Sequence, residues 1–130
     1  KIYSIDPGLS NAVSFKFSED IGRALENVVF LELLKRGVEI YYYMTAGNQE
    51  VDFLLKQGRG MTGLIQVSWS LEDKKTRHRE IRALSQAMEE TNINQGTILT
   101  YNEEETAEIK GRVIQIMPAW KWLVSAEKGG

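Results

Sequence analysis

Four polar residues stand where the sequence pattern predicts a hydrophobic core, and together they could bind a metal ion. Glu26 shares its helical face with apolar residues one turn away. Asp52 interrupts a run of strand-forming residues, where aspartate is unfavourable. Gln66 and Ser68 share one face of IQVSWS (65–70), opposite its apolar residues. Burying an ionised carboxylate is costly unless it has a partner or a metal, so these residues are candidates for a functional site.

The segments that carry Asp52 and Gln66 are joined by the glycine-rich stretch 57–63, which predicts a hairpin loop. Neighbouring strands can place Asp52 beside Gln66 and Ser68, and a covering helix could add Glu26. Oxygen ligands of this kind suit magnesium, manganese or calcium. The sequence has no cysteine and a single histidine, which excludes thiolate and multi-histidine metal sites.

Each acid also has a simpler interpretation. Taken alone, Glu26 would be a helix carboxylate bonded to backbone amides or an arginine, and Asp52 would be an edge-strand or turn-flanking acid. Taken together, these residues predict a shared polar pocket. The sequence leaves open whether a metal occupies that pocket.

The first helix follows from capping and periodicity signals. Ser18 predicts its start, and Gly37 is placed to end it after about Arg36. The stretch 28–34 is apolar nearly all round, with Glu32 the exception. A helix of this kind is predicted to pack on more than one side.

A second helix is predicted to begin after Ser70 or Asp73 and to end near Thr91. Its core stripe at helical spacing is Ile81, Leu84 and Met88. Strands are predicted at 2–6, 38–44, 50–56, 64–70, 96–101 and 112–118. The other stretches are an ambiguous turn at 9–15, an acidic loop at 102–108 and an aromatic segment, 119–123, that packs back on the domain.

The order helix, three strands, helix, strand predicts an α/β (α+β) fold with an αβββαβ core, in which helices flank a mixed sheet. The 130 residues suffice for one domain, 1–130, with a lead-in at 1–17 and a disordered tail at 124–130. Because the chain begins with Lys1 instead of methionine, we expect a fragment of a longer polypeptide.

Six stretches keep the order and rough spacing of a known family. They are IYSIDPGL (2–9), ENVVFLELLKRG (26–37), EVDFLL (50–55), IQVSWS (65–70), REIRAL (79–84) and PAWKWL (118–123). In them the chain resembles the PD-(D/E)XK nuclease-like C-terminal domain of a family of bacterial and archaeal ATPases, a domain of unknown function that follows an AAA-type ATPase domain. The resemblance implies a restriction-endonuclease-like fold and an upstream ATPase domain, which would be the part that binds ATP.

In active nucleases of that fold, a helix glutamate and a strand aspartate hold a divalent metal, and an acid and a lysine on the next strand complete the site. By resemblance, Glu26 and Asp52 match the first two, whereas Gln66 stands at the acid position and Ser68 at the lysine position. The resemblance therefore implies a degenerate catalytic site, with Glu26, Asp52 and Gln66 as the ligands if Mg²⁺ or Mn²⁺ binds. A displaced cation such as Lys56 is one route by which activity could survive.

The basic stretch KKTRHREIR (74–82) offers a candidate nucleic-acid contact. Lys75, Arg79 and Arg82 fall roughly on one flank of the second helix, near the expected pocket. Lys75 and Arg79 are further candidates for the missing cation. The alternative is a solvated helix face with ion pairs to neighbours such as Glu80.

Several aromatic residues have two interpretations. The run Tyr41, Tyr42 and Tyr43 and the pair Trp120 and Trp122 could stack on bases, or they could be core and interface anchors. His78 is expected on the surface. The glycines of 57–63 lack the phosphate-loop pattern, so this chain should not bind ATP by itself.

The formal net charge of −2 argues against a dedicated, strongly basic nucleic-acid binder but leaves room for a local basic patch. The sequence has no apolar run of membrane-spanning length and no signal-peptide pattern, so we expect a soluble, cytoplasmic protein without a membrane partner.

The leading functional hypothesis is a module with a degenerate site that binds DNA or RNA, or docks on its own upstream ATPase domain. An active divalent-metal-dependent nuclease is the first alternative. A structural or dimerisation domain, which would form an oligomer, is the second.

Overall fold

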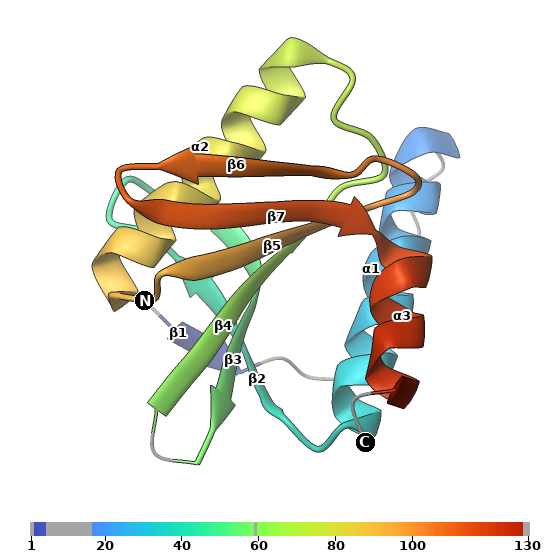
Figure 1. The fold of residues 1–130 in the computed structure, drawn as a ribbon, viewed down its shortest axis with the longest axis horizontal. Helices are drawn as coiled ribbons and strands as arrows, with labels where there is room; N and C mark the ends of the chain where they lie inside the picture. Colours follow the sequence, from blue (N-terminus) through green and yellow to red (C-terminus); the bar gives the residue numbers. More distant parts are fainter. Residues whose placement is uncertain (1, 5–16, 59, 129–130) are drawn as a thin grey trace.

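The computed structural model describes residues 2–4, 17–58 and 60–128, which form a seven-stranded mixed sheet flanked by helices (Figure 1). The strands are β1 (Ile2–Ser4), β2 (Glu39–Met44), β3 (Glu50–Gln57), β4 (Gly60–Val67), β5 (Gln95–Thr100), β6 (Glu105–Ile109) and β7 (Arg112–Pro118). The helices are α1 (Phe17–Lys35), α2 (Lys74–Thr91) and α3 (Ala119–Lys128). The predicted α/β class is confirmed, and the order from α1 to β5 is the expected αβββαβ.

The sheet has an antiparallel and a parallel half, in the strand order β1-β2-β3-β4-β5-β7-β6. Strands β1 to β4 pair antiparallel in sequence order, whereas β4, β5 and β7 run parallel. Helix α2 makes the crossover that the parallel neighbours β4 and β5 require. The carboxyl ends of β4, β5 and β7 therefore lie at the same end of the sheet.

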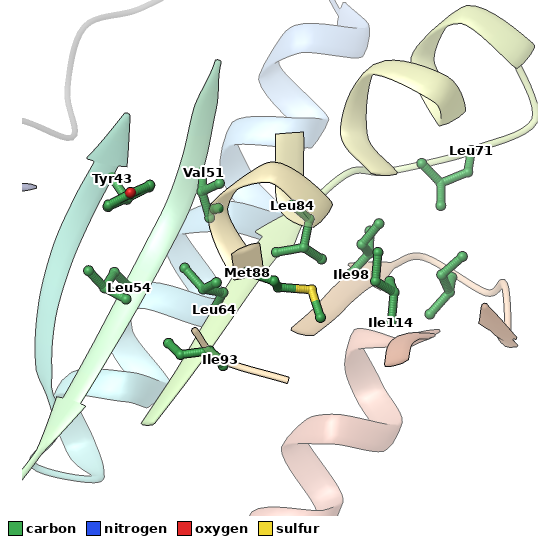
Figure 2. Close-up of a cluster of buried hydrophobic side chains, with 12 residues drawn as sticks. Tyr43, Val51, Leu54, Leu64, Leu71, Leu84, Met88, Ile93, Ile98 and Ile114 are labelled. Carbon is green, nitrogen blue, oxygen red and sulfur yellow. The ribbon is translucent and has the colours of Figure 1, made fainter. Parts of the chain in front are cut away.

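One hydrophobic core lies between α2 and the sheet (Figure 2). Leu84 and Met88 of α2 are fully buried in it, and Ile81 packs against it at the margin, as the predicted stripe requires. Gly96 of β5 allows the helix to approach closely, because a Cβ there would lie 2.9 Å from the Met88 sulfur. Glycine at this position is therefore a packing requirement.

The second core lies on the opposite face of the sheet, under α1 and α3, which contact each other there (Figure 1). Its buried members are Val29, Phe30, Leu33, Phe53, Ile65, Leu99, Ala119 and Trp122. The rings of Phe30 and Phe53 stack with centroids 6.3 Å apart. Strand residues thus alternate between two cores, as in a sheet covered on both faces.

The prediction that α1 packs on more than one side is wrong for the described part of the chain. Val28, Leu31 and Leu34 are 44%, 54% and 45% exposed. The sheet and α3 cover only one side of the helix. An apolar stripe of α1, which we define as Val28, Leu31 and Leu34, therefore faces outward at helical spacing.

Local signals placed two helix ends correctly and one incorrectly. Gly37 follows α1 with a φ of 75°, as a C-terminal cap requires. Asp73 caps α2 and accepts a hydrogen bond from the Thr76 N–H at 3.0 Å. The prediction for Ser18 is wrong, because α1 already begins at Phe17 and the serine lies within its first turn.

Two strands differ from the predictions. β4 covers Gly60–Val67 instead of 64–70, because backbone pairing with β3 extends through the glycine-rich stretch and overrides its turn tendency. The predicted acidic loop contains β6, Glu105–Ile109, which pairs with β7 at the edge of the sheet. Charged residues are typical of edge strands, where they deter further pairing.

The aromatic segment 119–123 forms the start of the helix α3, Ala119–Lys128, and it packs back on the domain as predicted, since Ala119 and Trp122 belong to the second core. Helical order continues to Lys128, so the prediction of a disordered tail from 124 is wrong up to that residue. The ambiguous stretch 9–15 and the end of the strand predicted at 2–6 lie outside the described residues. None of the described helices is long and apolar enough to cross a membrane.

Candidate functional site

The side chains of Asp52 and Gln66 meet where the ladder between β3 and β4 ends. The last backbone pair of this ladder joins Phe53 and Ile65. Beyond it, the Gln66 Oε1 accepts a hydrogen bond from the Asp52 N–H at 2.8 Å. The Gln66 Nε2 donates to the carbonyl oxygen of Glu50 at 3.0 Å. The carboxamide thus satisfies two backbone groups of β3 in place of a neighbouring strand.

The Asp52 side chain in turn bonds to the backbone of β4. Its Oδ2 accepts a hydrogen bond from the Val67 N–H at 2.8 Å. Gln66 is only 2% exposed and Asp52 is half-buried, so leaving these groups unpaired would be costly. The predicted proximity of Asp52 and Gln66 is therefore present, and the Asp52 Oδ2 and both polar atoms of the Gln66 carboxamide are engaged with backbone.

A β-bulge in β3 sets the direction of Asp52. Tyr41 pairs with Leu54 and Tyr43 with Val51, so two residues of β3 lie opposite one residue of β2. As a result, Val51 and Leu54 pack in the same core, under α2. Strict alternation along the strand would place Val51 and Leu54 on opposite faces, but a bulge interrupts the alternation and re-aims side chains.

The two residues line a pocket of about 440 Å³ between the β2–β3 hairpin, the ends of β3 and β4, and helix α2. Its lining consists of Asn48, Gln49, Glu50, Asp52, Gln66, Val67, Arg79, Glu80 and Ala83. Glu50 and Glu80 were not predicted as site residues. The helical phase of Glu80 beside Arg79, and the position of Glu50 two residues before Asp52, were the available signals.

The Asp52 carboxyl sits in an environment that disfavours its charge. Burial raises the pKa of Asp52 well above its usual range, and the negative charge of Glu26 raises it further. The hydrogen bond from the Val67 N–H acts in the opposite direction but is the smaller effect. Glu26 and Asp52 therefore interact electrostatically, although Glu26 is not among the residues that line the pocket.

The pKa values of two neighbouring carboxyl groups, Glu26 and Glu80, are also raised. Burial raises the pKa of Glu26, the charge of Arg23 opposes the shift, and Glu50 and Glu80 add to it. Burial also raises the pKa of Glu80, against the lowering effect of Arg79. These groups form an acidic cluster in which protonation of one favours ionisation of its neighbours.

Of the other predicted site residues, Ser68 and Lys56 lie outside the pocket lining, whereas Arg79 is part of it. The Ser68 hydroxyl donates to the Ser70 carbonyl oxygen at 3.0 Å, beyond the end of β4, and is not part of the pocket lining. Lys56 lies near the opposite end of the β3–β4 ladder, where it pairs with Met61. The cation at the pocket lining is Arg79, which forms an ion pair with Glu80 at 3.3 Å.

The remaining basic residues of α2, Lys75 and Arg82, are exposed and do not line the pocket. His78 is exposed, as expected. Within residues 2–4, 17–58 and 60–128, no group of three or more histidine, cysteine, aspartate and glutamate side chains is arranged to hold a metal ion. The Asp52 Oδ2 and the Gln66 Oε1 already accept hydrogen bonds from backbone N–H groups, which competes with binding of a divalent cation by these two atoms.

Two of the aromatic candidates are core anchors. Tyr43 is buried, and its hydroxyl donates to Glu90 at 2.6 Å. Trp122 is also buried, and the Arg36 guanidinium lies 4.1 Å from its ring centroid. Trp120 is 61% exposed.

Comparison with known proteins adds a family and a longer relative. A family model described as a domain of unknown function, DUF4143, matches residues 21–122. The chain is 40% identical over 134 residues to an uncharacterized protein of Methanocaldococcus jannaschii. This match covers 96% of the chain but only 29% of the relative, so the chain spans less than a third of the length of that protein.

Proposed function

The chain belongs to the DUF4143 family of domains of unknown function, and we propose that it is a non-catalytic, nuclease-like module that docks on another domain of a longer protein. One observation carries the first half of this proposal. The carboxamide of Gln66, at the position of a nuclease acid, bridges the Asp52 N–H and the Glu50 carbonyl oxygen. Both polar atoms of this side chain are thus already engaged with backbone, which supports a structural role for Gln66.

The missing positive charge supports the same proposal. Phosphodiester hydrolysis needs a preorganised cation where charge develops, and removing such a group costs orders of magnitude in rate. Ser68 stands at the lysine position and its hydroxyl is bonded locally to Ser70. Arg79 at the pocket is paired with Glu80, in surroundings dominated by carboxylates.

The docking half rests on the apolar stripe of α1 and on the length of the relative. Val28, Leu31 and Leu34 expose 44% to 54% of their surface in a row. Such a stripe is typical of a helix that packs against a further partner. The matched relative has more than two thirds of its length outside this domain. The resemblance to ATPase C-terminal domains suggests an ATPase domain as that partner.

The docking proposal is tested by placing a charge in the stripe. Leu31→Lys should abolish association between this domain and the remaining part of the longer protein, measured by analytical ultracentrifugation. Val124→Lys is the matched control, since Val124 is 45% exposed on α3 and lies outside the stripe. Undiminished association of the Leu31 variant would overturn the proposal.

Nucleic-acid binding is the second candidate, favoured by the exposure of Lys75, Arg79 and Arg82 on one flank of α2. Arg79→Ala combined with Arg82→Ala should weaken DNA or RNA binding and reduce its salt dependence. Arg77→Ala is the control, because the Arg77 side chain is only 31% exposed, against 69% for Arg79, and pairs with Glu105 at 2.6 Å. Absence of binding by the unaltered domain would remove this candidate.

A further inference from the structure

Two exposed aromatic rings stack on each other at the carboxyl ends of the parallel strands. The centroids of Trp69 and Tyr101 lie 4.5 Å apart, with an interplanar angle of 12°. Trp69 follows the end of β4 and Tyr101 follows the end of β5. They remain 38% and 55% exposed, and neither belongs to the two hydrophobic cores. The pair therefore presents aromatic surface to solvent.

Hydrogen bonds hold this pair in place. The Tyr101 N–H donates to the Trp69 carbonyl oxygen at 3.0 Å, which continues the pairing of β4 and β5 beyond the strands. The Leu71 N–H donates to the Glu103 Oε1 at 2.7 Å and ties the two following loops together. The Glu103 N–H in turn donates to the Thr100 hydroxyl at 2.9 Å. A surface held in this way loses little conformational entropy on binding.

The loops around the stack are strongly acidic. The segments 69–73 and 101–105 contain five carboxylates and no lysine or arginine. Lys121 pairs with Glu104, and Arg77 pairs with Glu105, so two of the carboxylates are compensated from outside the segments. In the described part of the chain, Glu72 and Glu103 form no ion pair. The two segments that carry the rings therefore have a net negative charge, and the basic residues Lys74 and Lys75 follow at the start of α2.

We propose that the Trp69–Tyr101 stack binds an arginine side chain in a basic segment of a protein partner. A cation over an aromatic face is attracted by the ring quadrupole, and nearby carboxylates add to that attraction. Arginine is favoured over lysine because its planar guanidinium can lie flat on a ring. The same acidic surroundings repel the phosphates of a nucleic acid.

The chain already contains one contact of this type. The guanidinium of Arg36 lies 4.1 Å from the ring centroid of Trp122. The proposed contact uses the same chemistry with the arginine supplied by a partner. It uses none of the residues of the apolar stripe of α1 and does not depend on the docking function proposed above.

The test is titration of the full chain into a fluorescein-labelled peptide containing three arginines separated by glycine, followed by anisotropy. We expect binding that weakens with salt and is reduced roughly fivefold or more by Trp69→Ala or Tyr101→Ala. Glu72→Lys should weaken it as well and leaves the rings in place. Trp120→Ala is the matched control, because Trp120 is exposed on α3, and should leave binding unchanged.

A peptide with citrulline in place of arginine keeps the planar group and removes the charge. Equal binding of that peptide would overturn the proposal, as would an equal loss with Trp120→Ala. Tighter binding of a single-stranded oligonucleotide that depends on Trp69 would also overturn it, and would assign the stack to bases instead.

Discussion

The Gln66 carboxamide oxygen accepts a hydrogen bond from the Asp52 N–H at 2.8 Å, at the point where β3 and β4 stop pairing through their backbones. In the active nucleases that this chain resembles in sequence, the residues at the two matching positions hold a metal ion. Here the Gln66 side chain links β4 to β3 beyond the last backbone pair, and the Asp52 side chain forms a second link by accepting from the Val67 N–H. We infer that this corner of the pocket stabilises the fold.

Replacing Gln66 with glutamate should therefore destabilise the domain. Gln66→Glu removes the donor to the Glu50 carbonyl oxygen and adds a negative charge beside Asp52. Leaving that buried carbonyl oxygen without a donor should cost about 1–3 kcal/mol of unfolding free energy. Urea denaturation measures the difference. Gln115→Glu on β7, where the amide is only partly buried, is the control and should cost less. An unchanged midpoint for the Gln66 variant would contradict the structural role.

The raised pKa of Asp52 predicts how stability depends on pH. An acid whose folded pKa lies above its unfolded value binds its proton more tightly in the folded state, so folding is favoured at low pH. The free energy of unfolding should fall as pH rises from the ordinary aspartate pKa of 3.8 through the raised folded value.

Asp52→Asn isolates this contribution, because asparagine can still accept the Val67 N–H. The variant should lose less stability than the unaltered protein over that pH range, as measured by denaturation at successive pH values. Parallel pH profiles for the two proteins would show that Asp52 does not titrate with folding. Glu26 and Glu80, whose pKa values are also raised, should account for the slope that remains.

The two sides of α1 should respond differently to truncation. Leu33 is 1% exposed in the core under α1 and α3, so Leu33→Ala should cost about 2–5 kcal/mol of unfolding free energy. Leu31 is 54% exposed, so Leu31→Ala should change stability by no more than about 0.5 kcal/mol. Thermal unfolding of the isolated domain compares the two. Similar losses would mean that the stripe is already covered.

Gly96 should tolerate no side chain. A Cβ there would lie 2.9 Å from the Met88 sulfur and 3.0 Å from Leu84 carbons, so Gly96→Ala should cost about 1–3 kcal/mol. Gly63→Ala on β4 is the control, because its nearest contact would be an ordinary 3.7 Å. Partial rescue by Met88→Ala would identify overpacking as the cause, and equal costs for both alanines would argue against it.

Local sequence signals predicted the parts of the fold that depend on short-range chemistry. Gly37 and Asp73 ended and began helices where expected, and hairpin connectivity placed Asp52 beside Gln66. The bulge in β3 was not predicted, because it arises from register with β2 and not from local propensity.

Longer-range features escaped prediction for a similar reason. The alternation of IQVSWS continues through Trp69, so the pattern gave no sign that β4 ends at Val67. The Trp69–Tyr101 stack joins residues 32 positions apart that meet only because β4 and β5 are parallel neighbours. The exposure of Leu31 depends on what α1 packs against, which its own sequence does not encode.

The most direct test of a non-catalytic site is a cleavage assay. The domain is incubated with plasmid DNA, single-stranded DNA and RNA in the presence of Mg²⁺ or Mn²⁺, beside a sample of Asp52→Asn. We predict no cleavage above the protein-free background for either protein on any substrate. Metal-dependent cleavage by the unaltered domain that is lost in Asp52→Asn would contradict the account and establish a working nuclease site.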